Sequence, residues 1–105
     1  ASNLAKEMRA TREFQVLKDA KAKLEAEPDT KNLVSRFMKL GQEVEILKYQ
    51  KKDVPAEKQE EFDRMMRTLS LNPLAVEYLN AFQRFQLMFQ DISKTITDVV
   101  KEVTD

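Results

Sequence analysis

The sequence contains no cysteine and no histidine. Without cysteine the chain cannot form a disulfide, use a thiol nucleophile or hold an iron–sulfur cluster through thiolates. Without histidine it lacks an imidazole base and the usual nitrogen ligand of zinc. Only one of its 105 residues is glycine and three are proline. Because a β-sandwich or barrel needs a turn about every 8–12 residues, this low turn content argues against both folds.

Other chemistry is also poorly supported by the residues present. A phosphate-binding loop needs several glycines, and Gly41 is the only one. Ser93 and Lys94 are adjacent, so on a helix their side chains point in different directions and do not form a nucleophile and base pair. A carboxylate-bridged metal site would want a Glu-x-x-His pattern, which cannot occur here. We therefore predict no catalytic residue, no cofactor and no metal ligand.

Length and charge favour one helical domain that binds proteins. The chain spans 1–105, about one domain's worth, and its 18 Lys and Arg residues balance 18 Asp and Glu residues. A balanced charge gives no general attraction to nucleic acid, so a nucleic-acid partner is not expected. No stretch approaches the roughly 20 apolar residues of a membrane span, and the first residues lead into the charged pair Lys6-Glu7. We expect a cytoplasmic protein without a membrane segment.

The prolines divide the chain into helical segments, because the residue before a proline is disfavoured in a helix. The predicted helices cover about 2–26, 29–52, 56–71 and 73–103. Pro28 and Pro73 fit the first turns of two of them, and Asn72 is suited to cap the last. The expected fold is all-α: an antiparallel bundle of about four long amphipathic helices, with corners marked by proline and a long C-terminal helix.

Two of these helices carry heptad seams, in which apolar residues alternate at spacings of three and four. In the segment 29–52 the seam consists of Leu33, Phe37, Leu40, Val44 and Leu47. In the last segment it consists of Tyr78, Phe82, Phe85, Phe89, Ile92, Ile96, Val99 and Val103. Each seam predicts a face that packs against another helix.

The last helix is too long for its shorter neighbour to cover. At about 1.5 Å per residue it would measure about 45 Å, roughly twice the length of the segment 56–71. The end of its seam must then be covered by the first helix or by a second subunit. We predict a homodimer or larger oligomer, with an interface formed by Phe85, Phe89, Ile92, Ile96, Val99 and Val103.

The segment 78–89 holds four of the eight aromatic residues and a single charge. Its apolar band spreads beyond the seam to Leu87 and Met88, with Gln83 and Arg84 alongside. This spread indicates either a helix buried among several neighbours or a contact site for another protein. The candidate partner surface therefore comprises Gln83, Arg84, Leu87 and Met88.

A basic turn forms the alternative site. Lys48, Lys51 and Lys52 surround Tyr49 and could bind phosphate or an acidic protein. The acidic run in 57–63 follows closely and could instead neutralise these lysines across the turn. A protein that binds RNA, or that associates with an RNase, through Lys48–Lys52 is therefore the competing hypothesis.

The order of these signals resembles the bacterial YlbF/YmcA family, especially its YheA-like members. The resemblance covers nearly the whole chain, and each motif is short, so it is their order and spacing that are specific. The matching residues are Glu13-Phe14, Leu17-Lys18, Ala20, Glu27-Pro28-Asp29, Phe37, Asn72-Pro73, the run Tyr78 to Phe85, Asp91-Ile92 and Ile96.

The resemblance implies a small, cytoplasmic, all-helical protein that dimerises or forms larger oligomers and has no enzymatic activity of its own. In the family, the two named members act with a third protein as regulatory partners that influence RNase Y-dependent RNA processing, competence, sporulation and biofilm formation. Two departures matter: some members hold iron–sulfur clusters through cysteines that this chain lacks, and the usual glycine after the second helix is replaced by Lys52-Asp53-Val54-Pro55. The predicted function is that of a non-enzymatic regulatory or adaptor subunit.

Overall fold

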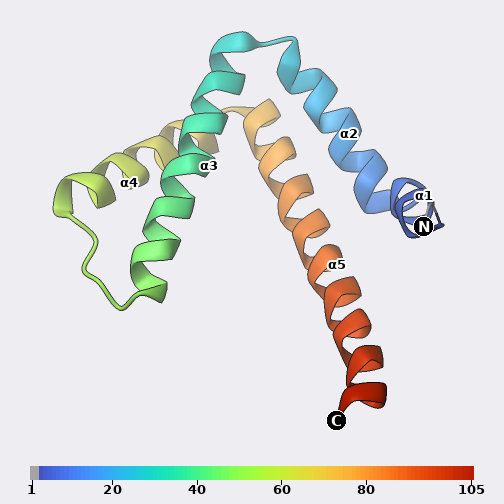
Figure 1. The fold of residues 1–105 in the computed structure, drawn as a ribbon. Coiled ribbons are helices and arrows are strands. Elements are labelled where there is room, and N and C mark those ends of the chain that lie inside the picture. The colour runs from blue at the N-terminus through green and yellow to red at the C-terminus, as the bar shows by residue number, and fades with distance from the viewer. Residues whose placement is uncertain (1–2) are drawn as a thin grey trace.

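The structure is a computed structural model that describes residues 3–105, and over this range it is helical without strands. This confirms the all-helical class. Five helices follow one another along the chain (Figure 1), with the bounds α1 Asn3–Arg9, α2 Arg12–Glu25, α3 Pro28–Tyr49, α4 Ala56–Ser70 and α5 Pro73–Thr104.

The prediction of one helix over 2–26 is wrong, because the segment breaks between α1 and α2. The hydroxyl of Thr11 accepts a hydrogen bond from the Phe14 amide at 3.2 Å and donates one to the Met8 carbonyl at 2.6 Å. Threonine thereby caps α2 and competes with the helical hydrogen bonds that would join it to α1. The described residues 3–105 form five helices in place of about four, and the predicted start at Ser2 lies outside them.

The other helices lie close to their predicted ranges. α4 and α5 begin and end within one residue of 56–71 and 73–103, whereas α3 ends at Tyr49 and not at Lys52. α5 is one unbroken helix of 32 residues.

Asn72 holds the corner between α4 and α5. Its side-chain oxygen accepts hydrogen bonds from the amides of Leu74 and Ala75, at 3.1 and 3.2 Å, and satisfies the exposed donors of the first turn of α5. Its Nδ2 donates to the hydroxyl of Thr30 at 3.1 Å, which ties the corner to the start of α3.

The core lies where the first turns of α3 and α5 meet the ends of α2 and α4. Its buried members are Leu24, Val34, Leu69 and Ala75, one from each of these four helices. Half-buried side chains pack around them, including Leu33, Phe37 and Tyr78. The core therefore holds the helix ends together at one side of the molecule.

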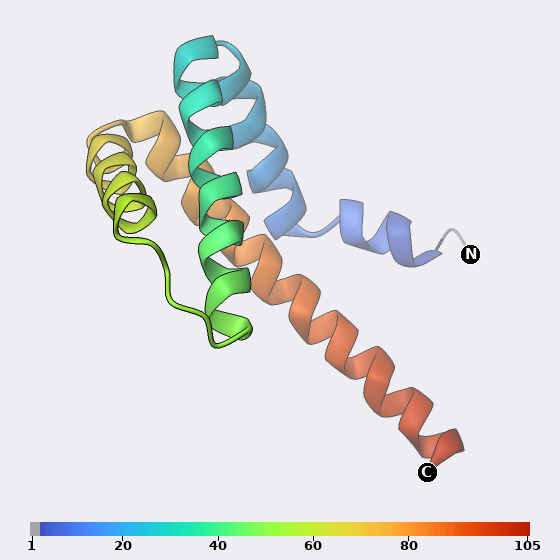
Figure 2. The ribbon, with the colours of Figure 1, turned by 60° about the vertical axis from the view of Figure 1, so that its left-hand side comes forward.

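The molecule is flat and extended. Its principal extents are 47 × 37 × 17 Å, and its radius of gyration is 17.0 Å, whereas a compact domain of this length has about 13 Å. The second half of α5 projects beyond the other helices in both views (Figures 1 and 2). This shape leaves one half of the longest helix with few neighbours.

Leu69 and Leu71 provide a test of where the core lies. Leu69 is 2% exposed and Leu71 is 86% exposed, two positions further along the chain. Leu69→Ala should lower the free energy of unfolding by about 2–5 kcal/mol through lost burial and a new cavity. Leu71→Ala, the matched control, should change it by less than about 0.5 kcal/mol. Urea denaturation followed by circular dichroism measures both, and equal effects would contradict the assigned core.

Candidate protein-interaction surface

The first half of α5 is covered by α2. The ring of Phe85 lies 6.3 Å from that of Phe14, and Lys23 Nζ forms a 2.8 Å ion pair with Glu77 Oε1. Ala81 is buried on the same helix. Phe85, predicted as an oligomer contact, is half-buried and packs against α2 of its own chain.

Beyond Phe85 the seam loses its cover. Phe89, Ile96 and Val99 are each about half exposed, and Val103 is 84% exposed. Ile92 is half-buried. Val100 is also half exposed, and it extends the apolar face because it lies four residues after Ile96 and three before Val103. We call Phe89, Ile92, Ile96, Val99, Val100 and Val103 the C-terminal stripe. A strict heptad reading misses Val100, whereas a search for apolar neighbours at i+4 would have found it.

α1 does not cover the C-terminal stripe. After the break at Thr11, α1 leaves a hollow of about 450 Å³ against α5, lined by Leu4 and Met8 on one side and by Ile92 and Ile96 on the other. Leu4 is itself about half exposed. The sequence predicted that either the first helix or a second subunit would cover the end of the seam. The first helix borders the stripe but does not cover it.

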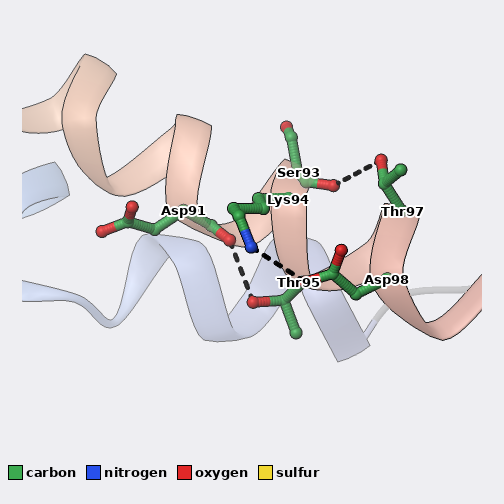
Figure 3. Close-up of polar contacts among 6 residues, drawn as sticks. All are labelled: Asp91, Ser93, Lys94, Thr95, Thr97 and Asp98. Atoms are coloured by element: carbon green, nitrogen blue, oxygen red, sulfur yellow. Dashed lines mark hydrogen bonds and ion pairs between the residues drawn. The ribbon is translucent and has the colours of Figure 1, made fainter.

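Several polar side chains on this half of α5 form hydrogen bonds within their own helix (Figure 3). Thr95 donates to the Asp91 carbonyl at 3.0 Å, and Thr97 donates to the Ser93 carbonyl at 2.9 Å. Lys94 pairs with Asp98 at 3.1 Å. Since these polar groups already have hydrogen-bond partners, a further contact with the projecting helix would gain most free energy by burying the apolar stripe.

The candidate partner surface is divided by the structure. Gln83 and Leu87 are exposed on the outer side of α5, and Leu87 is surrounded there by polar positions. Arg84 lines a small hollow shared with α2, and Met88 is half-buried. The four residues therefore do not form one continuous apolar patch, and their role in binding a partner stays a prediction.

A second apolar surface lies between α3 and α5, which splay apart. The groove has a volume of about 630 Å³. We call it the α3–α5 groove, and its lining includes Phe37, Gly41, Ile46, Phe62, Phe82 and Gln86. Phe37 and Phe62 stack at 4.9 Å and hold α4 against the α3 wall. No motif in the sequence marks this groove, because it depends on the angle between two helices.

A salt bridge fixes α4 beside the groove. Lys58 Nζ donates to Glu43 Oε2 at 2.7 Å. The hydrogen bond and charge of Lys58 lower the pKa of Glu43 below its ordinary value of 4.5. Elsewhere, the contact with Glu77 raises the pKa of Lys23, and burial raises the pKa of Tyr78.

The basic turn is open to solvent. Lys48, Lys51 and Lys52 are exposed and Tyr49 is 91% exposed. Within the described part of the chain, none of these lysines lies within 4.0 Å of a carboxylate, and Glu61 of the acidic run pairs with Arg36 instead. The predicted neutralisation across the turn is therefore absent.

Lys51 has a left-handed backbone with φ of 58°. The Lys52 amide donates to the Leu47 carbonyl at 2.9 Å, a pattern that ends helices and usually places glycine at the left-handed position. Lys51 thus places a side chain at a position where glycine would avoid the strain.

Two further features bear on possible chemistry. No group of three or more acidic residues within 3–105 is arranged to hold a metal ion. None of the helices in this range combines the length and the apolarity that crossing a membrane requires. The prominent features of the described surface are apolar faces.

Comparison with known proteins decides the family. Residues 1–101 match the family described as control of competence regulator ComK, YlbF/YmcA. The chain belongs to the YlbF/YmcA family. That description concerns regulation, and the predicted resemblance to this family is confirmed.

Several relatives match over almost the entire chain. A UPF0342 protein of Caldicellulosiruptor bescii is 31% identical over 96% of this chain and 85% of its own length. A UPF0342 protein of Desulfitobacterium hafniense is 29% identical over 98% of this chain and 83% of its own. One of Streptococcus mutans is 27% identical, with 98% and 91% covered. This YlbF/YmcA family chain therefore corresponds to most of each relative.

Lys51→Gly should stabilise the chain. Glycine adopts the left-handed conformation without the Cβ clash of lysine, but it has more backbone freedom to lose on folding. The net gain in the free energy of unfolding should be up to about 1 kcal/mol. Lys52→Gly, at a position without positive φ, should be neutral or destabilising. Thermal denaturation compares the two, and a loss of stability in Lys51→Gly would contradict the assigned turn.

The ion pair of Glu43 should make the free energy of unfolding depend on pH. The pKa of Glu43 is lower in the folded chain than its ordinary value of 4.5. Its contribution to the free energy of unfolding is therefore fully present at a pH above 4.5 and is lost as the pH falls through the folded-state pKa. Glu43→Gln should therefore lower the urea midpoint at pH 7, and the difference from the unmodified chain should shrink at pH 3. Glu60→Gln, on the exposed side of α4, should show no such convergence. A difference in urea midpoint between Glu43→Gln and the unmodified chain that is larger at pH 3 than at pH 7 would contradict the lowered pKa of Glu43.

Proposed function

We propose that this YlbF/YmcA family member is a non-enzymatic regulatory or adaptor subunit that acts in the cytoplasm through protein–protein contacts. Its residues 1–105 work as a single helical domain, and it functions as a homodimer or a larger oligomer. The antiparallel bundle expected from the sequence is completed when the helices of different copies pack together.

One observation carries this proposal: the C-terminal stripe is bare. Six apolar residues occupy one face of a helix that projects from the body, and five of them are half exposed or more. A monomer rarely leaves such a contiguous apolar face in water, and exposed faces of this kind mark interaction sites. The large radius of gyration has the same cause, because the projecting helix lacks neighbours.

The regulatory part of the proposal is supported by the family description, which names control of a competence regulator. Regulation of this kind works through contacts with other proteins. In the oligomer the C-terminal stripe serves self-association, and the outer side of α5 at Gln83 and Leu87, with Arg84 and Met88 beside it, remains for a different protein.

The basic turn is a weaker basis for function. Three exposed lysines beside Tyr49 could touch a few phosphates, but a chain of zero net charge offers no wider positive surface to hold RNA. The C-terminal stripe involves more residues and a larger unsatisfied surface, so protein binding is the better supported function.

Ile96→Asp/Val99→Asp should convert the oligomer into a monomer. Each aspartate would place an unpaired charge in the interface, which costs several kcal/mol. Sedimentation velocity measures the mass, and circular dichroism verifies that the variant remains helical.

The matched control, Lys94→Glu, changes the net charge by the same amount at an exposed position on the side of α5 opposite the stripe and should remain an oligomer. An unmodified chain that sediments as a monomer, or an aspartate variant of unchanged mass, would contradict self-association through the stripe.

A further inference from the structure

Two apolar surfaces in this chain lack cover: the C-terminal stripe and the α3–α5 groove. We propose that the C-terminal stripe of one copy docks into the α3–α5 groove of a second copy, and that the exchange is reciprocal about a two-fold axis. This inference rests on the proposed self-association and specifies where the stripe binds. The competing arrangement packs the two stripes directly against each other.

The positions of the two surfaces suit an exchange. α3 and α5 run toward the same end of the molecule and separate as they do so, and the second half of α5 continues past the end of α3 (Figures 1 and 2). The groove includes Ile46 near the end of α3 and Gln86 on the facing side of α5. Two copies that meet end to end can each insert the projecting half of α5 between the α3 and α5 of the other.

The chemistry of the groove matches the projecting helix. The groove has an apolar floor that includes Ile46, which is 56% exposed, and a polar edge formed by the amides of Gln42, Gln86 and Gln90 and by the carboxylate of Glu45. Its occupant should therefore be apolar along its centre and polar along its flanks.

The projecting half of α5 has this pattern. Thr95 and Thr97 flank the C-terminal stripe, and the Lys94–Asp98 ion pair lies on the opposite side of the helix. The threonine hydroxyls already donate to carbonyls of their own helix, so burying them leaves no donor without a partner.

Gly41 gives independent support for an occupant. It is the only glycine of the chain, it lies inside α3 without positive φ, and it lines the groove. A Cβ added there would meet only Phe62 Cε1, at the ordinary contact distance of 3.4 Å. The folded chain thus has room for alanine, which is the better helix former. A glycine at this site is explained by the close approach of another helix to the α3 backbone.

The surface needed for a stable dimer favours the exchange. The six residues of the stripe, about half exposed, offer on the order of 300 Å² of apolar surface. A stable interface buries about 800 Å² of total surface per partner, of which about 450 Å² is apolar. In a two-fold exchange each copy contributes both its stripe and its groove, which roughly doubles the apolar surface buried, whereas stripe against stripe uses one surface alone.

Complementary charges can distinguish the two arrangements. The groove variant is Gln42→Glu/Ile46→Glu, and the stripe variant is Ile96→Lys/Val99→Lys. All four positions are exposed, so both variants should fold. Alone, each variant should self-associate more weakly by on the order of tenfold or more, because both of its contacts place like charges in an apolar site.

Mixing the two variants should restore the dimer. The mixed dimer has one contact in which glutamates face lysines and one contact that is unmodified. Sedimentation equilibrium of the unmodified chain, each variant and the equimolar mixture measures this. The control variant Asn32→Glu/Ser35→Glu, elsewhere on α3, should associate like the unmodified chain and should not rescue the stripe variant.

A groove variant that associates as tightly as the unmodified chain, or a mixture no tighter than the stripe variant alone, would overturn docking in the groove while leaving self-association through the stripe intact. An unmodified chain that stays monomeric would overturn both. Restoration of the dimer when the stripe variant is mixed with the groove variant, but not when it is mixed with the control variant, would establish the exchange.

Discussion

The packing of α2 on the first half of α5 is the contact on which the rest of the structure depends. Phe14 meets Phe85, Lys23 meets Glu77, and the small side chain of Ala81 is buried on the same helix. Small residues allow two helix backbones to approach closely, so this contact holds α5 near its beginning. Since α2 begins at Arg12, cover for α5 ends near Phe85.

The break at Thr11 therefore has a functional meaning as well as a structural one. A continuous helix over 2–26 would have carried apolar residues further along α5. The cap at Thr11 instead makes α2 begin there, and α1 leaves an open hollow beside Ile92 and Ile96. The bare stripe and the splayed groove both follow from helices that separate from α5 before it ends, which explains how a chain with a well-packed core still exposes apolar surface.

Much of this fold could be predicted from the sequence, because heptad spacing and proline positions report directly on helix faces and corners. The seam of α5 and the Asn72-Pro73 corner are examples. What could not be predicted depended on local competition or on angles. Thr11 lies among strong helix formers, so its capping role was hidden. Lys51 has a left-handed backbone that its residue type disfavours. Ala75 and Ala81 are buried, yet periodicity gives weight to large side chains and overlooks alanine.

The unbroken run of α5 from core to projecting end also makes it a mechanical arm. From Phe89 to Thr104 the free part measures about 22 Å, so a tilt of about 10° at its base would move its end by about 4 Å. Events near Asn72 and Thr30, where the arm is anchored, could thus be transmitted to the far end of the molecule without any change in the helix itself. A protein that pushed on this corner would move the C-terminal stripe without touching it.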